Sequence, residues 1–173
     1  MNKLKYAGIL YDDIANGTGF GATLFFQGCP HHCPGCHNPE TWNFDDGKEL
    51  TPEIINDLLE YFEDRFYANR LSISGGEPLA NENANKIYTH FITHEFKKLY
   101  PNHKVWLWTG YQFEDLTDAQ KVCLQYVDIL IDGPFIQSKK DLTLPFRGSK
   151  NQRILDCQLS LQAGHPILHK EYM

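Results

Sequence analysis

The most constraining feature of this sequence is a regular alternation of short apolar runs with helical patterns. Four runs, bounded by glycine or polar residues, have the length and composition of buried strands: 22–29, 70–74, 103–110 and 127–133. Such runs suit a sheet that is covered on both faces. Because helical segments lie between them, the order predicts crossover connections and a parallel sheet of the α/β class.

Three helices are expected between these strands. The first begins at Thr51 and Pro52, a capping residue followed by proline. The third opens at Thr117 with a capping box that Gln120 completes, and it places Cys123 on its inner face, where a free cysteine packs as a small apolar residue. The second helix carries the apolar residues Ile87, Tyr88, Phe91, Ile92 and Leu99.

The length of 173 residues limits how far this pattern can extend. A complete eight-fold (βα) barrel takes ~250 residues, so this chain has room for only about five or six strand–helix units. We therefore expect a single domain over residues 1–173, folded as an incomplete barrel whose sheet stays open along one side. That opening leaves space for a large substrate.

Charge and hydropathy exclude several classes of protein. Sixteen Lys and Arg residues against 22 Asp and Glu give a net charge of -6, and no run of residues forms a basic patch, so direct nucleic-acid binding is not expected. No apolar stretch approaches the ~20 residues that cross a bilayer, and residues 1–13 lack the pattern of a signal peptide. We expect a cytoplasmic protein without membrane partners.

Three of the five cysteines lie within eight positions, at Cys29, Cys33 and Cys36. They follow a predicted strand directly, and the prolines and glycine between them oppose helix formation, so the three thiols share one compact loop. Clustered thiols in a reducing compartment are typical of metal binding. A 4Fe-4S cluster normally takes four cysteines, so this triplet leaves either one open iron or a distant fourth ligand.

Structural zinc is the alternative interpretation of this loop. The three thiols and one of His31, His32 or His37 have the donor types of a tetrahedral Cys3His site. Cys157 has no second cysteine near it in the sequence, so the thiols outside the triplet cannot hold an additional cluster. One cluster is therefore the maximum.

A glycine-rich turn follows the second predicted strand, at 74–78 (Ser-Gly-Gly-Glu-Pro). In open α/β sheets ligands bind outside the carboxyl ends of the strands, which is where this turn lies. Gly75 and Gly76 permit close backbone approach, and Glu77 offers a carboxylate for an ammonium group. Taken alone the turn is also consistent with a purely structural role, but it comes one strand after the cysteine triplet.

Together these two motifs, Cys-x3-Cys-x2-Cys and Gly-Gly-Glu-Pro, resemble the radical S-adenosylmethionine (SAM) superfamily, whose members fold as full or partial (βα) barrels. Within it the chain is similar, in order and over nearly its whole length, to the family that activates anaerobic ribonucleoside-triphosphate reductase. The motifs that carry this similarity are Asn16-Gly17, GCPHHCPGCHNPETW at 28–42, WTGY at 108–111, DGPF at 132–135 and RGSKNQR at 147–153.

The resemblance implies the chemistry. Cys29, Cys33 and Cys36 would bind three irons of one 4Fe-4S cluster, and SAM would chelate the fourth. Reductive cleavage of SAM would give methionine and a 5'-deoxyadenosyl radical, which would abstract hydrogen from a glycine of the reductase. The alternatives are another small radical SAM enzyme, such as an activase of a different glycyl-radical enzyme or a deazapurine synthase, and a zinc-stabilised binding domain.

The resemblance also implies which residues contact SAM. Gly75, Gly76 and Glu77 would lie at its methionine amino group. Two further segments would line the pocket: Gly35, Cys36 and His37 around the third cysteine, and Trp108, Thr109 and Gly110 at the end of the third strand.

Two protein partners are expected. No flavin or nicotinamide fingerprint is present, so the electron should come from a flavodoxin or ferredoxin-type donor. The reductase is the second, and the long polar segment 134–153, with Lys139, Lys140 and Arg147, is the expected docking loop. The sequence leaves open whether Asp132 acts in catalysis or belongs to a turn, and whether Arg147 and Arg153 bind the SAM carboxylate, bind the partner protein or are solvated loop residues.

Overall fold

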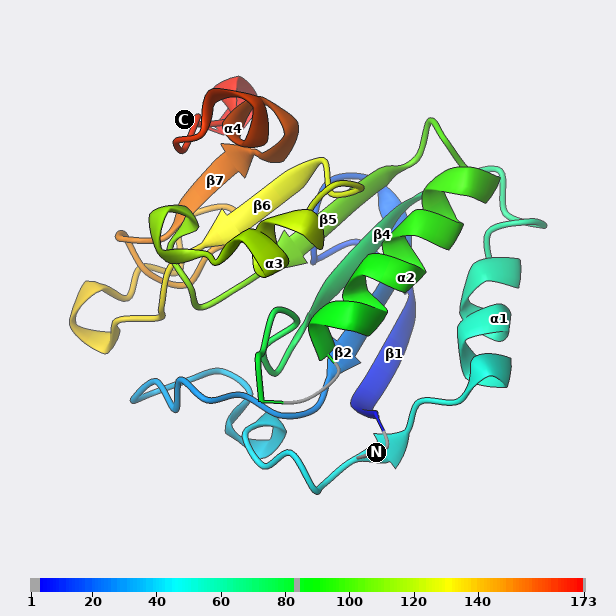
Figure 1. The fold of residues 1–173 in the computed structure, drawn as a ribbon, viewed down its shortest axis with the longest axis horizontal. Coiled ribbons are helices and arrows are strands. Elements are labelled where there is room, and N and C mark those ends of the chain that lie inside the picture. The colour runs from blue at the N-terminus through cyan, green and yellow to red at the C-terminus, as the bar shows by residue number, and fades with distance from the viewer. Residues whose placement is uncertain (1–3, 83–84, 173) are drawn as a thin grey trace.

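One seven-stranded sheet organises the chain, which the computed structural model describes for residues 4–82 and 85–172 (Figure 1). The strand order is β3-β1-β2-β4-β5-β6-β7. The strands are β1 (Lys5–Asp13), β2 (Phe20–Phe26), β3 (Lys48–Glu49), β4 (Ala68–Gly75), β5 (Lys104–Trp108), β6 (Ile129–Asp132) and β7 (Arg153–Asp156).

The centre of the sheet is parallel and its edges are antiparallel. Strands β2, β4, β5 and β6 pair in parallel, as the alternation predicts, and they place their carboxyl ends at one edge. β1 runs antiparallel to β2, because a short turn at 14–19 joins the two strands. β1 also pairs antiparallel with β3, and β7 runs antiparallel to β6. The open α/β sheet is confirmed. Within the described ranges the sheet has only four parallel strands. The length had led us to expect about five or six strand–helix units.

Three helices connect the four parallel strands, and a fourth follows β7: α1 (Pro52–Glu60), α2 (Asn85–Leu99), α3 (Asp118–Val122) and α4 (Cys157–Ala163). Short 3-10 turns lie at Pro39–Thr41, Phe113–Asp115, Gln137–Lys139 and Lys170–Tyr172. Both predicted helix starts are confirmed: Thr51 caps α1, and Thr117 and Gln120 form the capping box of α3. Among the described residues, no helix combines the length and apolarity needed to cross a membrane.

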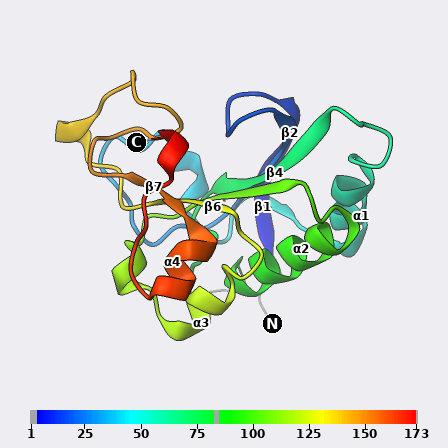
Figure 2. The same ribbon diagram turned by 90° about the horizontal axis from the view of Figure 1, so that it is seen from above.

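Both faces of the sheet are covered, which explains the uninterrupted apolar runs of its central strands. Along β5, Val105 and Leu107 pack into the main core beneath the helices, whereas Trp106 joins a second core on the other face. In Figure 2, α2, α3 and α4 lie on one side of the sheet, while loops lie on the other. The second core includes Phe146 and Tyr172, which come from these loops and from the C-terminal segment.

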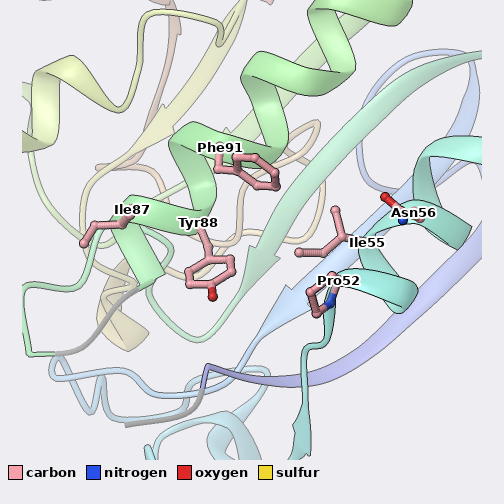
Figure 3. Close-up of a pocket in the computed structure, with 6 residues that line it drawn as sticks. All are labelled: Pro52, Ile55, Asn56, Ile87, Tyr88 and Phe91. Carbon is pink, nitrogen blue, oxygen red and sulfur yellow. The ribbon is translucent and has the colours of Figure 1, made fainter. Parts of the chain in front are cut away.

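Helix α2 is apolar on two faces, which the sequence pattern did not separate. The residues it buries are Asn85, Thr89, Ile92, Thr93 and Phe96, so threonines occupy part of the inner face. Of the apolar residues named above, Ile87 is 62% exposed and Phe91 48% exposed. These two side chains line a groove whose opposite wall is formed by Pro52, Ile55 and Asn56 of α1. In Figure 3, Tyr88 and Phe91 lie on the side of α2 nearer to α1, whereas Ile87 lies farther from it.

Candidate cluster and ligand site

The cysteine loop follows β2 at the carboxyl edge of the parallel strands. Cys29, Cys33 and Cys36 are free thiols that are partly exposed. Backbone hydrogen bonds hold the start of the loop, from Gly28 to Thr41 (2.8 Å) and from Cys29 to the carbonyl of Trp42 (3.0 Å). The loop is therefore fixed to the segment that follows it in the chain.

Burial disfavours the thiolate forms of two of these residues, Cys29 and Cys33. It raises the pKa of Cys29 to about 12, with smaller contributions from the negative charges of Glu77 and Cys33, and it also raises the pKa of Cys33. Iron binds thiolates, so loading this loop with iron releases protons.

The residues fit an iron–sulfur cluster by their donor chemistry. Three thiols on one loop are the donors that such clusters use, each cysteine binding a different iron, so they need not converge on one point. In residues 4–82 and 85–172, no set of three or more Cys, His, Asp or Glu side chains is gathered closely enough to hold a single metal ion.

The buried carboxylate of Glu77 connects the cysteine loop to two strand ends. Only 1% of this residue is exposed. The carboxylate accepts hydrogen bonds from the backbone N–H groups of Leu79 (2.9 Å) and Gly110 (2.7 Å) and from the Thr109 hydroxyl (2.8 Å). Nε2 of His31, inside the cysteine loop, lies 2.8 Å from Oε2 of Glu77, the oxygen that also accepts from Gly110. The structure thus brings Glu77, Thr109 and Gly110 together, and it gives the carboxylate four partners within the protein.

The glycines before Glu77 allow two backbones to approach closely. The N–H of Gly76 donates to Phe26, and the N–H of Glu77 donates to Gly28, both at 2.8 Å. Gly75 has a φ of +95°, and a Cβ on Gly76 would lie 2.4 Å from the carbonyl oxygen of Gly28. The chain that these glycines approach is the one leading into Cys29.

A cavity of about 560 Å³ lies beside the cysteine loop. Its volume is within the range of small-molecule and cofactor sites. Three of the residues expected around SAM line it: Gly35, His37 and Trp108. Its other walls come from the turn after β1, from the ends of β2 and β4 and from the 134–153 loop; they include Asn16, Phe25, Ser74, Phe135, Lys140, Leu142, Phe146, Arg147 and Gln152.

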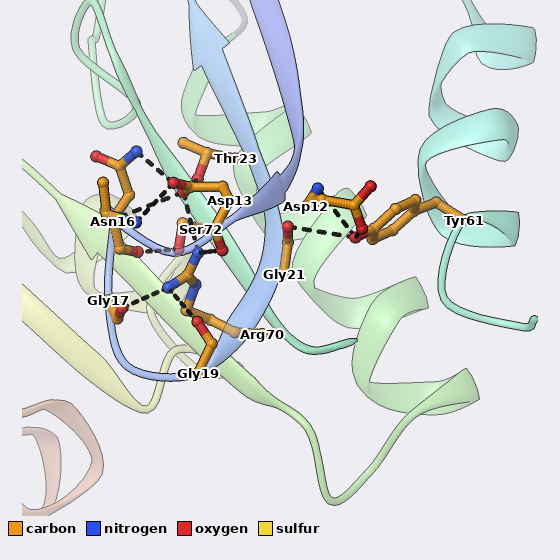
Figure 4. Close-up of polar contacts among 11 residues, drawn as sticks. Asp12, Asp13, Asn16, Gly17, Gly19, Gly21, Thr23, Tyr61, Arg70 and Ser72 are labelled. Carbon is orange, nitrogen blue, oxygen red and sulfur yellow. Dashed lines mark hydrogen bonds and ion pairs between the residues drawn. The ribbon is translucent and has the colours of Figure 1, made fainter. Parts of the chain in front are cut away.

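A buried ion pair positions Asn16 on the wall of this cavity (Figure 4). Asp13 and Arg70 are 4% and 0% exposed, and the guanidinium Nη2 donates to the carboxylate at 2.9 Å. Asn16 donates its side-chain amide to the same carboxylate (3.0 Å), and its carbonyl accepts from the Ser72 hydroxyl (2.5 Å). Arg70 was missed by the sequence reasoning, although a lone arginine within an apolar strand is a signal for a paired buried charge.

Asp132 and Arg153 form an ion pair whose contacts connect neighbouring elements of the fold. Asp132 is fully buried, accepts a hydrogen bond from the Phe113 N–H (2.9 Å) and pairs with Arg153. Arg153 also forms two hydrogen bonds to Glu114, at 2.9 and 2.7 Å, which lower the pKa of Glu114 to about 2. These contacts join β6, β7 and the Phe113–Asp115 turn. Arg147, whose role the sequence also left open, lines the cavity.

Comparison with known proteins identifies the family of the chain. A family model described as a 4Fe-4S single cluster domain matches residues 15–155, which include the cysteine loop, the glycine turn and all the residues that line the cavity. The chain is similar to anaerobic ribonucleoside-triphosphate reductase-activating proteins of Vibrio cholerae (39% identity over 155 residues, 89% of this chain and 97% of the relative), Escherichia coli (39% over 144 residues, 81% and 90%) and Enterobacteria phage T4 (36% over 151 residues, 87% and 93%). The chain therefore belongs to the family of anaerobic ribonucleoside-triphosphate reductase-activating proteins and contains a 4Fe-4S single cluster domain.

Proposed function

We propose that this chain, as a single domain, activates anaerobic ribonucleoside-triphosphate reductase by forming a glycyl radical on it. Cys29, Cys33 and Cys36 hold one 4Fe-4S cluster, and SAM occupies the adjoining cavity. The observation that carries this proposal is the position of the cavity, whose wall includes Gly35 and His37 on either side of the third cysteine. A ligand there lies next to the cluster.

When bound, the cluster and SAM supply the chemistry, in which one electron cleaves SAM to methionine and a hydrogen-abstracting 5'-deoxyadenosyl radical. The residues of the chain position and shield these groups. Trp108, Phe135 and Phe146 give the cavity part of its apolar wall, and Lys140 and Arg147 give it positive charge suited to a carboxylate. Contacts with the methionine amino group are assigned to Gly75, Gly76 and Glu77. Cys36, Thr109 and Gly110 complete the SAM site.

Two partners complete the reaction, which we place in the cytoplasm. The electron comes from a flavodoxin or ferredoxin-type protein, and the partly exposed cysteines suit its approach. The reductase covers the open side of the sheet and presents its glycine at the cavity. The 134–153 loop supports this docking, because Lys140, Leu142 and Arg147 reach from it to the cavity wall.

The test is anaerobic incubation of the iron-loaded protein with the reductase, SAM and a reduced flavodoxin or ferredoxin, followed by electron paramagnetic resonance. We expect a glycyl radical signal on the reductase. NADPH without a carrier protein should give none. Replacement of Cys29 by Ala should abolish both the signal and SAM cleavage, because the cluster loses a ligand.

The matched control is Cys123→Ala. Cys123 is a buried residue at the C-cap of α3, and its thiol donates a hydrogen bond to the carbonyl of Ala119 (3.2 Å). This variant should keep its iron and its radical yield. Full iron content and activity in Cys29→Ala would refute the assignment of the cluster ligands.

A further inference from the structure

A groove between α1 and α2 has a partly apolar lining, in which Ile55 belongs to the core and Tyr88 packs against it, whereas Ile87 and Phe91 lie outside the core. It has a volume of about 390 Å³ and is lined by Pro52, Ile55, Asn56, Ile87, Tyr88 and Phe91 (Figure 3). Single exposed apolar residues are common on protein surfaces, whereas an exposed apolar patch is typical of an interaction site, and Ile87 and Phe91 form a small patch of this kind. Ile87 and Phe91 are one helical turn apart and both are about half exposed or more, at 62% and 48%.

The groove begins near the edge of the sheet that carries the cysteine loop. α2 follows the carboxyl end of the parallel strand β4, so its first turn lies at that edge. The side chain of Asn85, the first residue of α2, donates to the carbonyls of Glu77 (3.0 Å) and Gln27 (3.1 Å). The apolar end of the groove is thereby tied to the glycine turn and to the end of β2.

The other end of the groove is acidic. Past Asn56 it continues into a second hollow of about 420 Å³, whose lining includes Glu60, Glu63 and Glu95. Glu95 lies 3.8 Å from Lys98, whereas Glu60 and Glu63 are exposed. Burial and the negative charges of Glu63 and Glu60 raise the pKa of Tyr100, which also lines this hollow. One surface thus offers an apolar hollow followed by negative charge.

We propose that the α1–α2 groove binds an amphipathic, basic helix of the reductase. Two apolar side chains one turn apart on that helix fill the hollow beside Ile87 and Phe91, and Lys or Arg residues further along it meet Glu60 and Glu63. Apolar anchors in a groove supply the affinity of such complexes, and complementary charge fixes the direction of the bound helix. This inference rests on the proposed function, since it names a second contact for the same partner.

The first test measures the affinity of the iron-loaded protein for the purified reductase, under anaerobic conditions, by biolayer interferometry. The double variant Ile87→Ser with Phe91→Ser should bind about ten-fold or more weakly, as expected when anchor residues are truncated. The matched control is Val122→Ser with Leu159→Ser, which removes two apolar side chains of similar exposure, 49% and 46%, from other helices. It should bind like the wild type.

The second test examines charge. Glu60→Lys with Glu63→Lys should weaken binding at low ionic strength, and the difference from the wild type should shrink as salt is added. Glu171→Lys, which reverses an exposed carboxylate near the C-terminus, should change binding little. SAM cleavage with dithionite in the absence of reductase should be unchanged in all of these variants, because none lies at the cavity.

The outcomes separate this inference from the proposed function. If the wild type neither binds nor activates the reductase, the proposed function fails. If the wild type does both and Ile87→Ser with Phe91→Ser binds equally well, only the groove assignment is overturned. It is also overturned if sedimentation shows that the wild type self-associates through this groove, the double variant being monomeric while its affinity for reductase is unchanged.

Discussion

At the scale of single residues, Glu77 shows how one buried charge can organise a site. Its carboxylate is surrounded by hydrogen-bond donors from the glycine turn, from the end of β5 and from His31 in the cysteine loop. A buried carboxylate is stable only when such donors replace the water that it loses. The same bonds fix the relative positions of the three segments around the proposed cluster and SAM.

Glu77→Gln should therefore weaken both folding and ligand binding. An amide has one accepting oxygen, so its NH2 group would face a donor such as the Gly110 N–H and leave it unpaired. We expect the free energy of unfolding to fall by about 1.5–3 kcal/mol, measured by urea denaturation. SAM affinity, measured by equilibrium dialysis of the iron-loaded protein, should fall about ten-fold, a loss near 1.4 kcal/mol.

The control for this prediction is Glu82→Gln, which changes an exposed carboxylate shortly after the same turn. It should leave both quantities at the wild-type values. Wild-type stability in Glu77→Gln would show that the four contacts of this carboxylate do not hold the site together.

The sequence predicted which residues gather near this site, but not the hydrogen bonds that they form. The cysteine spacing and the glycine turn predicted that both motifs lie at the carboxyl edge of the parallel strands, as they do, and Gly35, His37 and Trp108 line one cavity there. The hydrogen bonds of Glu77 could not be predicted, because they join residues 31, 77 and 109–110, which become neighbours only when the strands pair. For the same reason the sequence did not show that Gly75 and Gly76 also pack against the backbone of 26–28.

At the scale of elements, the turn between β1 and β2 depends on a charge in β4. Arg70 reaches from β4 to the carboxylate and carbonyl of Asp13 and to the carbonyls of Gly17 and Gly19. Burial lowers the pKa of Arg70, although the negative charge of Asp13 opposes this effect. The arginine thus fixes a turn whose Asn16 forms part of the cavity wall.

Arg70→Met should destabilise the protein strongly, because it leaves the carboxylate of Asp13 buried without a cationic partner. The expected loss is about 3–5 kcal/mol in urea unfolding. The double variant Asp13→Asn with Arg70→Met has no unpaired charge, so it should be more stable than Arg70→Met alone. Equal stability of the two variants would contradict a role for the charge pair.

Local signals explain which elements were predictable. Thr51 and Thr117 form caps within four residues of chain, so both helix starts followed from the sequence. Strands β1 and β7 were not foreseen, since β1 has a mixed burial pattern and β7 has only four residues. In α2 the apolar residues cover two faces, and only the position of the neighbouring helix shows which face the sheet buries.

At the scale of the whole molecule, the open sheet leaves the 134–153 loop as a wall of the cavity. The base of this loop is held by hydrogen bonds from the Trp108 indole to Phe146 (2.8 Å) and from the Asn151 amide to Pro134 (2.7 Å). Its tip is exposed, with Leu142 at 81%. The 134–153 loop thus has a base held by hydrogen bonds and a solvent-exposed tip, which a docking partner can contact.

Binding of the reductase should slow hydrogen exchange of residues 134–153, measured by mass spectrometry. Lys139→Glu with Lys140→Glu should lower the radical yield several-fold at low salt, because charges at the rim of an interface set the rate of association. Lys48→Glu with Lys170→Glu gives the same change in net charge on other exposed surfaces and should retain the yield. Unchanged exchange and yield with the partner bound would place the docking surface elsewhere.

The anchoring of the cysteine loop bears on how the protein is maintained in a cell. The loop is held through backbone bonds of Gly28 and Cys29 to 41–42 and through the contact of His31 with Glu77. A polypeptide that keeps its ligand loop in shape by itself can receive a cluster after folding is complete. Damage by oxygen would then be reversible, since assembly factors could rebuild the inorganic part on the same folded chain, without new synthesis.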